Sequence, residues 1–571
     1  MSSPGAARLP DGFTVALDRR TRRLDGGAAL LGLSPGRLLH LAPAARRLLD
    51  AGPGAGLDAG ADLIVRDNTS ARLARRLLDA GIAHPVVASP GVPAGPPPAE
   101  VTVVVPVRDR PAGLRRLLDA LAGSTLADPS TLADPAGLAD PAGPDGPATL
   151  AEVIVVDDGS ADPAGCRASA EGSVLGDRVR LIRHPRSRGP AAARNTGAAA
   201  ARTELVAFLD SDVVPGPGWL APLLAHLADP AVGLAAPRIT ALPPSDRPPG
   251  WLDRYERLRS SLDLGPEPGP IVPRTRVAYV PSAALLVRRV ALGAGFDEEL
   301  RVAEDVDLVL RLHAAGWRLR YEPAATVAHE HRARPIDWWA RKAFYGTGAA
   351  ALALRHPGSV PPMVLAPWAA AVCLLVGAQR RSGLVAAAGV TGVAWWRVRR
   401  TLAPTGAASS VGAASAPGTA PPGGGARLEQ PGRVAALLVG LGLAGAANQA
   451  AGLLVRHWWP VAAVGCLRSR RVRRAVLAAA LAEGLLDWWR HRPEHPEHGL
   501  DPVRYLLAHR ADDLGYGAGL WWGALRRRTL APLRPVLTGL GGRRRIRRVA
   551  GKVTSSAVRP GSSRNASSDL G

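Results

Sequence analysis

Two short apolar runs that end in acidic residues decide the fold of this 571-residue chain. They read V-I-V-V-D-D at residues 153–158 and V-A-F-L-D-S-D at residues 206–212. Each run has the length and composition of a buried strand, so its carboxylates lie at the carboxyl end of that strand. Open α/β sheets bind their ligands at this edge. The sequence therefore predicts an α/β domain with an acidic site at one edge of its sheet.

A third acidic pair, Glu304-Asp305, opens an amphipathic helix further along the chain. A nucleotide diphosphate is a dianionic leaving group, so an Asp-x-Asp pair beside it implies a divalent cation between protein and diphosphate. A separate carboxylate then remains to take a proton from an acceptor hydroxyl. Any one of these acids alone is equally well explained as a turn residue or a helix N-cap. Three in series, two of them on strand ends, favour the catalytic interpretation.

Further motifs follow in a fixed order over about residues 100 to 335. They are Val101–Arg110, Val155–Ser160, Gly189–Asn195, Phe208–Asp212, Tyr279–Arg288, Gly295–Glu298, and Glu304–Leu308 with Arg311 and Gly316-Trp317. On these residues the chain resembles the inverting family 2 glycosyltransferases of the GT-A fold. The resemblance implies a Rossmann-like nucleotide-diphospho-sugar transferase domain.

The same resemblance implies the residues that hold a UDP-sugar donor. Pro106 and Asp158 would border the uracil and the ribose, with Asp157 the less favoured partner. Arg194 would lie near the diphosphate, whose charge suits a planar guanidinium.

The resemblance also implies a metal site and a general base. Asp212, supported by Asp210, would bind Mg²⁺ or Mn²⁺. A histidine some two dozen residues after the base would complete this site; His329 fits, His331 lies close behind, and a solvated strand end is the alternative for both. In the pair Glu304-Asp305, Asp305 would be the general base, at the start of a helix where acids are favoured.

Segments around this core resemble those of the mycofactocin system glycosyltransferases. They are Trp251–Leu264, Asp337–Gly346, a small N-terminal module and a hydrophobic C-terminal region. That family attaches glucose units to a redox cofactor made from a ribosomal peptide. The resemblance implies UDP-glucose as donor and a peptide-derived cofactor precursor as acceptor.

Residues 1–90 are expected to form a small N-terminal module. Phe13–Arg20 is strand-like, Gly26-Gly27 marks a hairpin, and Leu38–Leu49 and Thr69–Leu78 have helical spacing. This order resembles the winged-helix peptide-recognition modules related to PqqD, which hold a precursor peptide as an added strand. A structural cap on the catalytic domain is the alternative.

Composition divides the rest of the chain. A Pro-rich linker at 91–99 precedes the GT-A domain at 100–335, whose residues 125–147 form a low-complexity surface insertion with Leu-Ala-Asp-Pro repeats. An amphipathic connector is expected at 336–358, apolar helices at 359–490, and a basic, partly disordered tail at 491–571.

The net charge of +23 is concentrated as Arg clusters after residue 376, and these clusters flank apolar stretches. Basic residues beside apolar segments favour a membrane surface over nucleic acid. Val360–Gln379 and Val434–Val455 have the length of a bilayer crossing, whereas Ser382–Trp396 and Trp458–Leu467 are shorter. A soluble helical cap is the alternative for all four.

The expected location is the cell membrane, multi-pass or peripheral, with the catalytic domain in the cytoplasm where UDP-sugars are supplied. No signal peptide is apparent, and three widely separated cysteines suggest a reduced setting.

The sequence therefore predicts a metal-dependent hexosyltransferase. One alternative within the class is a cell-wall or exopolysaccharide transferase with a lipid-linked acceptor. An alternative from another class is a non-catalytic, nucleotide-binding membrane scaffold, which would not require Asp212 and Asp305.

Overall fold

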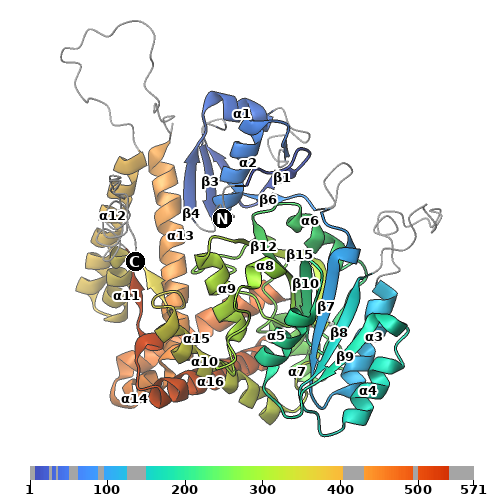
Figure 1. Cartoon of the computed structure of the whole chain (residues 1–571). Coiled ribbons are helices and arrows are strands. Elements are labelled where there is room, and N and C mark those ends of the chain that lie inside the picture. Colours follow the sequence, from blue (N-terminus) through green and yellow to red (C-terminus); the bar gives the residue numbers. More distant parts are fainter. Residues whose placement is uncertain are drawn as a thin grey trace, which may run out of the picture.

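The computed structural model describes residues 7–24, 27, 29–33, 36–50, 62–87, 95–124, 150–402, 430–492 and 499–538. An N-terminal module lies above a central α/β domain, and C-terminal helices cover one flank and the base of that domain (Figure 1). The predicted insertion at 125–147 and two parts of the predicted tail, 493–498 and 539–571, lie outside the described residues, as do residues 91–94 of the predicted linker.

Among the described residues, nine strands form the central sheet, in the order β11-β15-β12-β14-β10-β7-β8-β9 with β13 beside β15. Strands β10, β7, β8 and β9 run parallel, and β14 joins them antiparallel to β10. The predicted α/β class is thus confirmed, with a mixed sheet. The strand bounds are β7 Val101–Val107, β8 Glu152–Asp157, β9 Val179–Arg183, β10 Leu205–Leu209, β11 Val213–Pro215, β12 Val232–Ala241, β13 Gly269–Pro270, β14 Ala284–Arg288 and β15 Arg318–His329.

Helices cover both faces of this sheet, so its central strands are apolar throughout instead of alternating. One core packs α3 and α6 against the sheet, and the second packs α5 and α9 on the opposite face. Both predicted strands exist, and each ends where its acidic residues begin. The helix bounds are α3 Pro111–Ser124, α4 Pro163–Glu171, α5 Pro190–Ala200, α6 Leu220–Leu227, α7 Trp251–Arg259, α8 Arg289–Leu292 and α9 Glu304–Ala314.

In its described residues, the N-terminal module has two three-stranded sheets, β5-β1-β6 and β2-β3-β4. The predicted helix at Leu38–Leu49 is wrong in its first part, because residues 36–40 pair with β3 as a strand and the helix begins only at Pro43, a residue suited to a first helical position. The bounds are β1 Thr14–Leu17, β2 Arg22–Leu24, β3 Ala29–Leu33, β4 Gly36–His40, α1 Pro43–Asp50, β5 Leu63–Ile64, α2 Asn68–Asp79 and β6 Ala83–Pro85.

The module is fixed to the central domain by ion pairs. Arg75 Nη2 lies 2.8 Å from Asp229 Oδ1, and Arg318 Nε lies 2.7 Å from Asp79 Oδ1. The first pair is largely buried, so loss of either partner would leave a charge in an apolar contact.

Two long helices of the C-terminal region, α10 and α16, lie side by side beneath the central domain (Figure 1). Their backbones touch at glycines: a Cβ on Gly519 would stand 1.7 Å from the carbonyl oxygen of Ala343. The basic tail predicted from residue 491 is therefore wrong over Pro502–Arg526, a glycine-rich helix with a buried face. The bounds are α10 Pro335–Arg355, β16 Val364–Leu365, α11 Pro367–Gly377, α12 Arg381–Leu402, α13 Pro431–Gly452, a π-helical turn Leu453–His457, α14 Trp459–Arg468, α15 Arg470–His491, α16 Pro502–Arg526 and β17 Val536–Leu537.

Within the described chain, one helix, Pro431–His457, is long and apolar enough to cross a bilayer. The other predicted crossing, Val360–Gln379, is broken into a short strand and an eleven-residue helix. Prolines at 361, 362 and 367 remove the backbone donors that a continuous helix there would need.

Candidate active site

The carboxyl ends of β8 and β10 meet at one edge of the sheet, as the two acidic runs predicted. Asp157 is the last residue of β8, Asp158 directly follows it, and Asp210 directly follows β10. The third pair, Glu304-Asp305, begins α9 and comes to the same edge. The buried guanidinium of Arg194 connects Asp210 to Glu304.

Arg194 of α5 joins Asp210, which follows β10, to Glu304, which begins α9. Its Nη2 lies 2.6 Å from Asp210 Oδ1, and its Nη1 lies 3.0 Å from Glu304 Oε1. The side chain is 3% exposed, and its guanidinium carbon lies 5.3 Å from the Phe296 ring centroid. Burial would lower the pKa of Arg194, but Asp210 and Glu304 raise it well above its ordinary value. The sequence placed Arg194 near a diphosphate and missed this bridge between carboxylates.

Asp212 and His329 lie together because of strand pairing. Val213 of β11 pairs with His329 of β15, so the histidine stands beside the preceding aspartate. His329 Nε2 lies 3.6 Å from Asp212 Oδ1. Arg110, which the sequence analysis did not single out, lies 3.0 Å from Asp212 Oδ2.

His331 belongs to a different cluster. Its Nε2 lies 2.8 Å from Asp253 Oδ1, and Arg247 holds the other oxygen of the same carboxylate. The geometry thus places His329 beside Asp212 and His331 beside Asp253.

The donor set fits a hard divalent cation in part. Asp212 and His329 supply an oxygen and a nitrogen ligand in reach of each other. Asp210 is turned toward Arg194, and the three residues do not present ligand atoms that all lie within 4.8 Å; in the described part of the chain only Glu483, His509 and Asp513 do so. Since Mg²⁺ is commonly held by one or two carboxylates plus substrate phosphates, two protein ligands are sufficient for such a site.

The second cluster, Glu483, His509 and Asp513, is an ion-pair network within the C-terminal helices. Arg510 pairs with both carboxylates of this cluster, and Arg456 lies 3.1 Å from Asp513 Oδ1. Two guanidinium groups already compensate its acids, so its chemistry is that of a structural link between α15 and α16.

Asp305 has the environment of a general base. Its Oδ2 accepts a hydrogen bond from the backbone N–H of Ser282 at 3.1 Å, and its Oδ1 accepts one from the N–H of Val306 at 2.7 Å. Burial and the neighbouring Glu304 raise the pKa of Asp305 to about 7, against the lowering effect of these hydrogen bonds and of Arg194. A base with such a pKa is ionised in part near neutral pH and is a good proton acceptor there.

The residue before this pair is strained. Ala303 caps α9 with φ of +67°, a left-handed conformation that is uncommon for alanine. This backbone turn brings Glu304 toward Arg194 while Asp305 faces the Ser282 segment.

Asp158 and Asp157 hold loops at the sheet edge. Asp158 accepts hydrogen bonds from His184 Nδ1 (2.8 Å), Ser187 Oγ (2.7 Å), and the N–H groups of Arg188 and Gly189 (both 2.8 Å). Burial opposes ionisation, but these hydrogen bonds outweigh it and lower the pKa of Asp158.

Asp158 thereby fixes the start of α5, the helix that carries Arg194. Asp157 is paired with Arg183, and Pro106 is buried in β7 opposite Val156. Contacts of these three residues with a uridine stay a prediction.

Comparison with known proteins adds the following findings. Residues 102–291 match the family model "Glycosyl transferase family 2", and residues 205–405 match "Glycosyl transferase family group 2". The chain is 43% identical over 537 residues to "Pre-mycofactocin glycosyltransferase" of Mycobacterium tuberculosis, covering 93% of this chain and 99% of the relative. It is also 35% identical over 181 residues to the succinoglycan biosynthesis protein ExoU of Rhizobium meliloti, covering 30% of this chain and 51% of that protein.

Solved structures with a similar fold include two glycosyltransferases. One is GalNAc-T7 with UDP, GalNAc and Mn²⁺, at 18% identity and a TM-score of 0.31, covering 44% of this chain and 52% of that one. The other is the mannosyltransferase PcManGT of Pyrobaculum calidifontis with GDP-Man and Mn²⁺, at 20% identity and a TM-score of 0.32, covering 69% of this chain and 90% of that one.

Proposed function

Because this chain belongs to the family 2 glycosyltransferases, as a relative of the pre-mycofactocin glycosyltransferase, we propose that it transfers glucose from UDP-glucose to a peptide-derived redox cofactor precursor. The observation that carries this proposal is the joining of the acidic groups at one sheet edge, with Arg194 bridging Asp210 and Glu304 beside the half-buried Asp305. A nucleotide-binding scaffold would not need a carboxylate whose pKa is raised toward neutrality.

In the proposed reaction, Asp305 removes the proton of the acceptor hydroxyl while that oxygen attacks the anomeric carbon of the sugar. A new C–O bond forms, and the bond from the anomeric carbon to the diphosphate oxygen breaks, so UDP leaves and the configuration inverts. Asp212 and His329, with Asp210 in support, would hold Mg²⁺ or Mn²⁺, which would neutralise charge on the diphosphate. Arg194 balances the negative charges of Asp210 and Glu304. The backbone N–H of Ser282 orients the carboxylate of Asp305.

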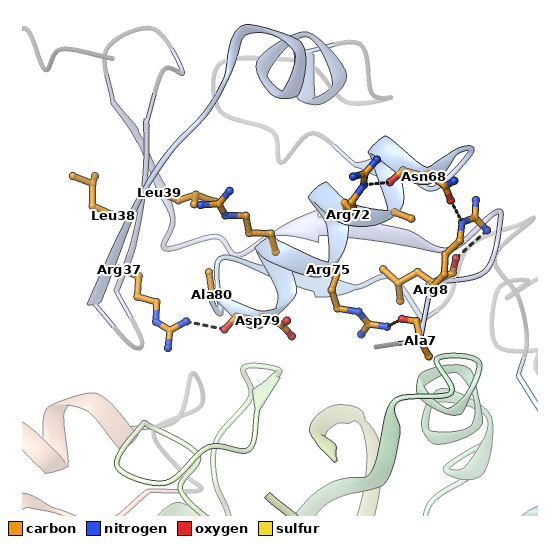
Figure 2. Close-up of a pocket in the computed structure, with 13 residues that line it drawn as sticks. Ala7, Arg8, Arg37, Leu38, Leu39, Asn68, Arg72, Arg75, Asp79 and Ala80 are labelled. Carbon is orange, nitrogen blue, oxygen red and sulfur yellow. Dashed lines mark hydrogen bonds between the residues drawn. The ribbon is translucent and has the colours of Figure 1, made fainter. Parts of the chain in front are cut away.

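The N-terminal module is proposed to hold a peptide portion of the pathway's precursor. A cavity of about 590 Å³ lies between β4 and α2, and Figure 2 shows its side chains. Five arginines line it, two of which are already paired, Arg75 with Asp229 and Arg8 with Asp11. Its one lining acid, Asp79, is paired with Arg318. In the described sheet β4 pairs with β3 alone, so its outer edge is free for an added strand. The lining arginines are Arg8, Arg37, Arg72, Arg75 and Arg76.

The location at a membrane is likewise proposed. The apolar helix Pro431–His457 supports it, although Val434 and Leu438 in its first turns pack against Ala29 and Leu38 of the N-terminal module. The exposed face of the later turns, which includes Leu441, is then the part that contacts lipid, since Ala446 is buried against Leu365 and Ala369. Co-sedimentation with anionic vesicles, lost when Leu441 and Gly445 are replaced by Asp, would support this; full binding by that variant would contradict it.

The test of the function is direct. The purified chain is incubated with UDP-glucose, Mn²⁺ and pre-mycofactocin, and products are resolved by mass spectrometry. Addition of hexose to pre-mycofactocin is expected. Transfer only to a lipid-linked acceptor would instead support the exopolysaccharide alternative, and the same assay with UDP-galactose decides the sugar.

A further inference from the structure

Three tyrosines from separate parts of the chain lie near the start of α9: the charge of Asp305 contributes to the raised pKa of Tyr279 and of Tyr345, and Tyr516 contributes to that of Tyr279. Tyr279 is 43% exposed and precedes by three residues the Ser282 N–H that binds Asp305. Tyr345 is carried by α10, and Tyr516 by α16. The reaction as described above gives none of them a role.

Glycines set the position of Tyr345. A Cβ on Gly348, one turn further along the same face of α10, would stand 2.9 Å from Cβ of Ala303 and 3.3 Å from Cγ1 of Val302. These two residues immediately precede Glu304-Asp305. The close approach therefore holds this face of α10 against the start of the catalytic helix.

A second close contact brings Tyr516 to the same place. A Cβ on Gly346 would stand 2.1 Å from the carbonyl oxygen of Tyr516, so α10 and α16 meet directly beside Tyr345. The Arg456 guanidinium carbon lies 4.1 Å from the Tyr516 ring centroid, and Arg341 lies 5.9 Å from that of Tyr345. Each ring thus has a guanidinium within cation–π distance.

The phenols are neutral hydrogen-bonding groups. Burial, together with the charge of Asp305, raises the pKa of Tyr345 to about 12. The Tyr345 phenol therefore does not compete with Asp305 as a base at neutral pH. Each offers a flat apolar face and one hydroxyl.

We propose that Tyr279, Tyr345 and Tyr516 form the acceptor subsite and stack against a ring of the acceptor, so that its hydroxyl points at Asp305. The ligand class is a neutral molecule with a flat ring and a free hydroxyl. This inference rests on the proposed transferase function. It assigns the C-terminal helices α10 and α16 to the active site, in addition to any contact with a membrane.

The test compares Tyr345→Ala with Tyr345→Phe and with a control on the same helix, Leu354→Ala. Leu354 is 50% exposed. With pre-mycofactocin as the probe, Tyr345→Ala should raise the KM for this acceptor about tenfold or more while the KM for UDP-glucose changes less than about twofold. Tyr345→Phe keeps the ring and should stay within about threefold of wild type, and Leu354→Ala should match wild type.

If Tyr345→Ala raised the KM for UDP-glucose as much as the KM for the acceptor, the proposal would be overturned. Such a result would indicate a displacement of α9 instead of a lost stacking contact. An unchanged acceptor KM would also overturn the proposal. If the wild-type enzyme hydrolysed UDP-glucose but did not modify pre-mycofactocin, the proposed acceptor would be refuted. The tyrosine subsite would still be open to test. The subsite is then judged with 4-methylphenol, which should slow that hydrolysis in wild type and not in Tyr345→Ala; equal behaviour of the two proteins would overturn it.

Discussion

The pH dependence of transfer should report the ionisation of Asp305. Burial and Glu304 raise the pKa of this carboxyl to about 7, and only the ionised form accepts the proton of the acceptor hydroxyl. Below that value the active fraction falls with pH, to about one tenth at pH 6 and about one hundredth at pH 5. An ordinary aspartate would be almost fully ionised over the same range.

The assay is kcat/KM for transfer between pH 5 and 8.5, at saturating UDP-glucose, because this parameter reports ionisations before the acceptor binds. Glu304→Gln serves as the internal comparison. Its amide oxygen can still accept the hydrogen bond from Arg194, but the charge that raises the pKa is gone, so the acidic limb should move down by on the order of one pH unit. A flat profile to pH 5, or an acidic limb that stays in place in Glu304→Gln, would refute the reasoning.

Three other outcomes are expected. Asp212→Ala should lose both transfer and metal-dependent UDP affinity, measured by calorimetry with and without EDTA, since His329 would be left as the lone nearby ligand; equal UDP affinity in both buffers would contradict this. Arg110→Ala frees Asp212 from its ion pair, so Mn²⁺ should bind more tightly, by a few fold, in the absence of nucleotide. Arg72→Glu with Arg76→Glu reverses two charges on the groove of the N-terminal module and should abolish binding of an acidic peptide, measured by fluorescence anisotropy, while UDP affinity stays at the wild-type level.

The central sheet and the order of its acidic groups were predictable because they depend on local patterns. Residues 153–158 and 206–212 each combine an apolar strand with carboxylates at its end, and parallel pairing of β7 with both β8 and β10 brings such ends to one edge. The family resemblance favoured His329 over His331, and the pairing of β11 with β15 places His329 beside Asp212.

Contacts between residues far apart in sequence were not predictable. Arg194 is 110 residues from Glu304, and no local pattern shows that its guanidinium will bridge Asp210 and that glutamate. The α16 helix was read as part of a basic tail because Arg clusters follow it at 526–528 and 543–548, whereas glycines that pack on α10 determine its place. The strand at Gly36–His40 was hidden because two adjacent leucines fit a helix as well as a strand edge.

Turnover of Asp305→Asn tests the central claim most directly. The amide keeps the shape of the carboxylate and can still accept the N–H of Ser282, but it cannot take up a proton at neutral pH. Single-turnover transfer from UDP-glucose to pre-mycofactocin is measured with UDP affinity in parallel. The account predicts a rate lowered by about 10² to 10⁴ with nearly unchanged UDP affinity. A variant that keeps more than about one tenth of the wild-type rate would contradict it, because loss of a general base does not allow so much activity.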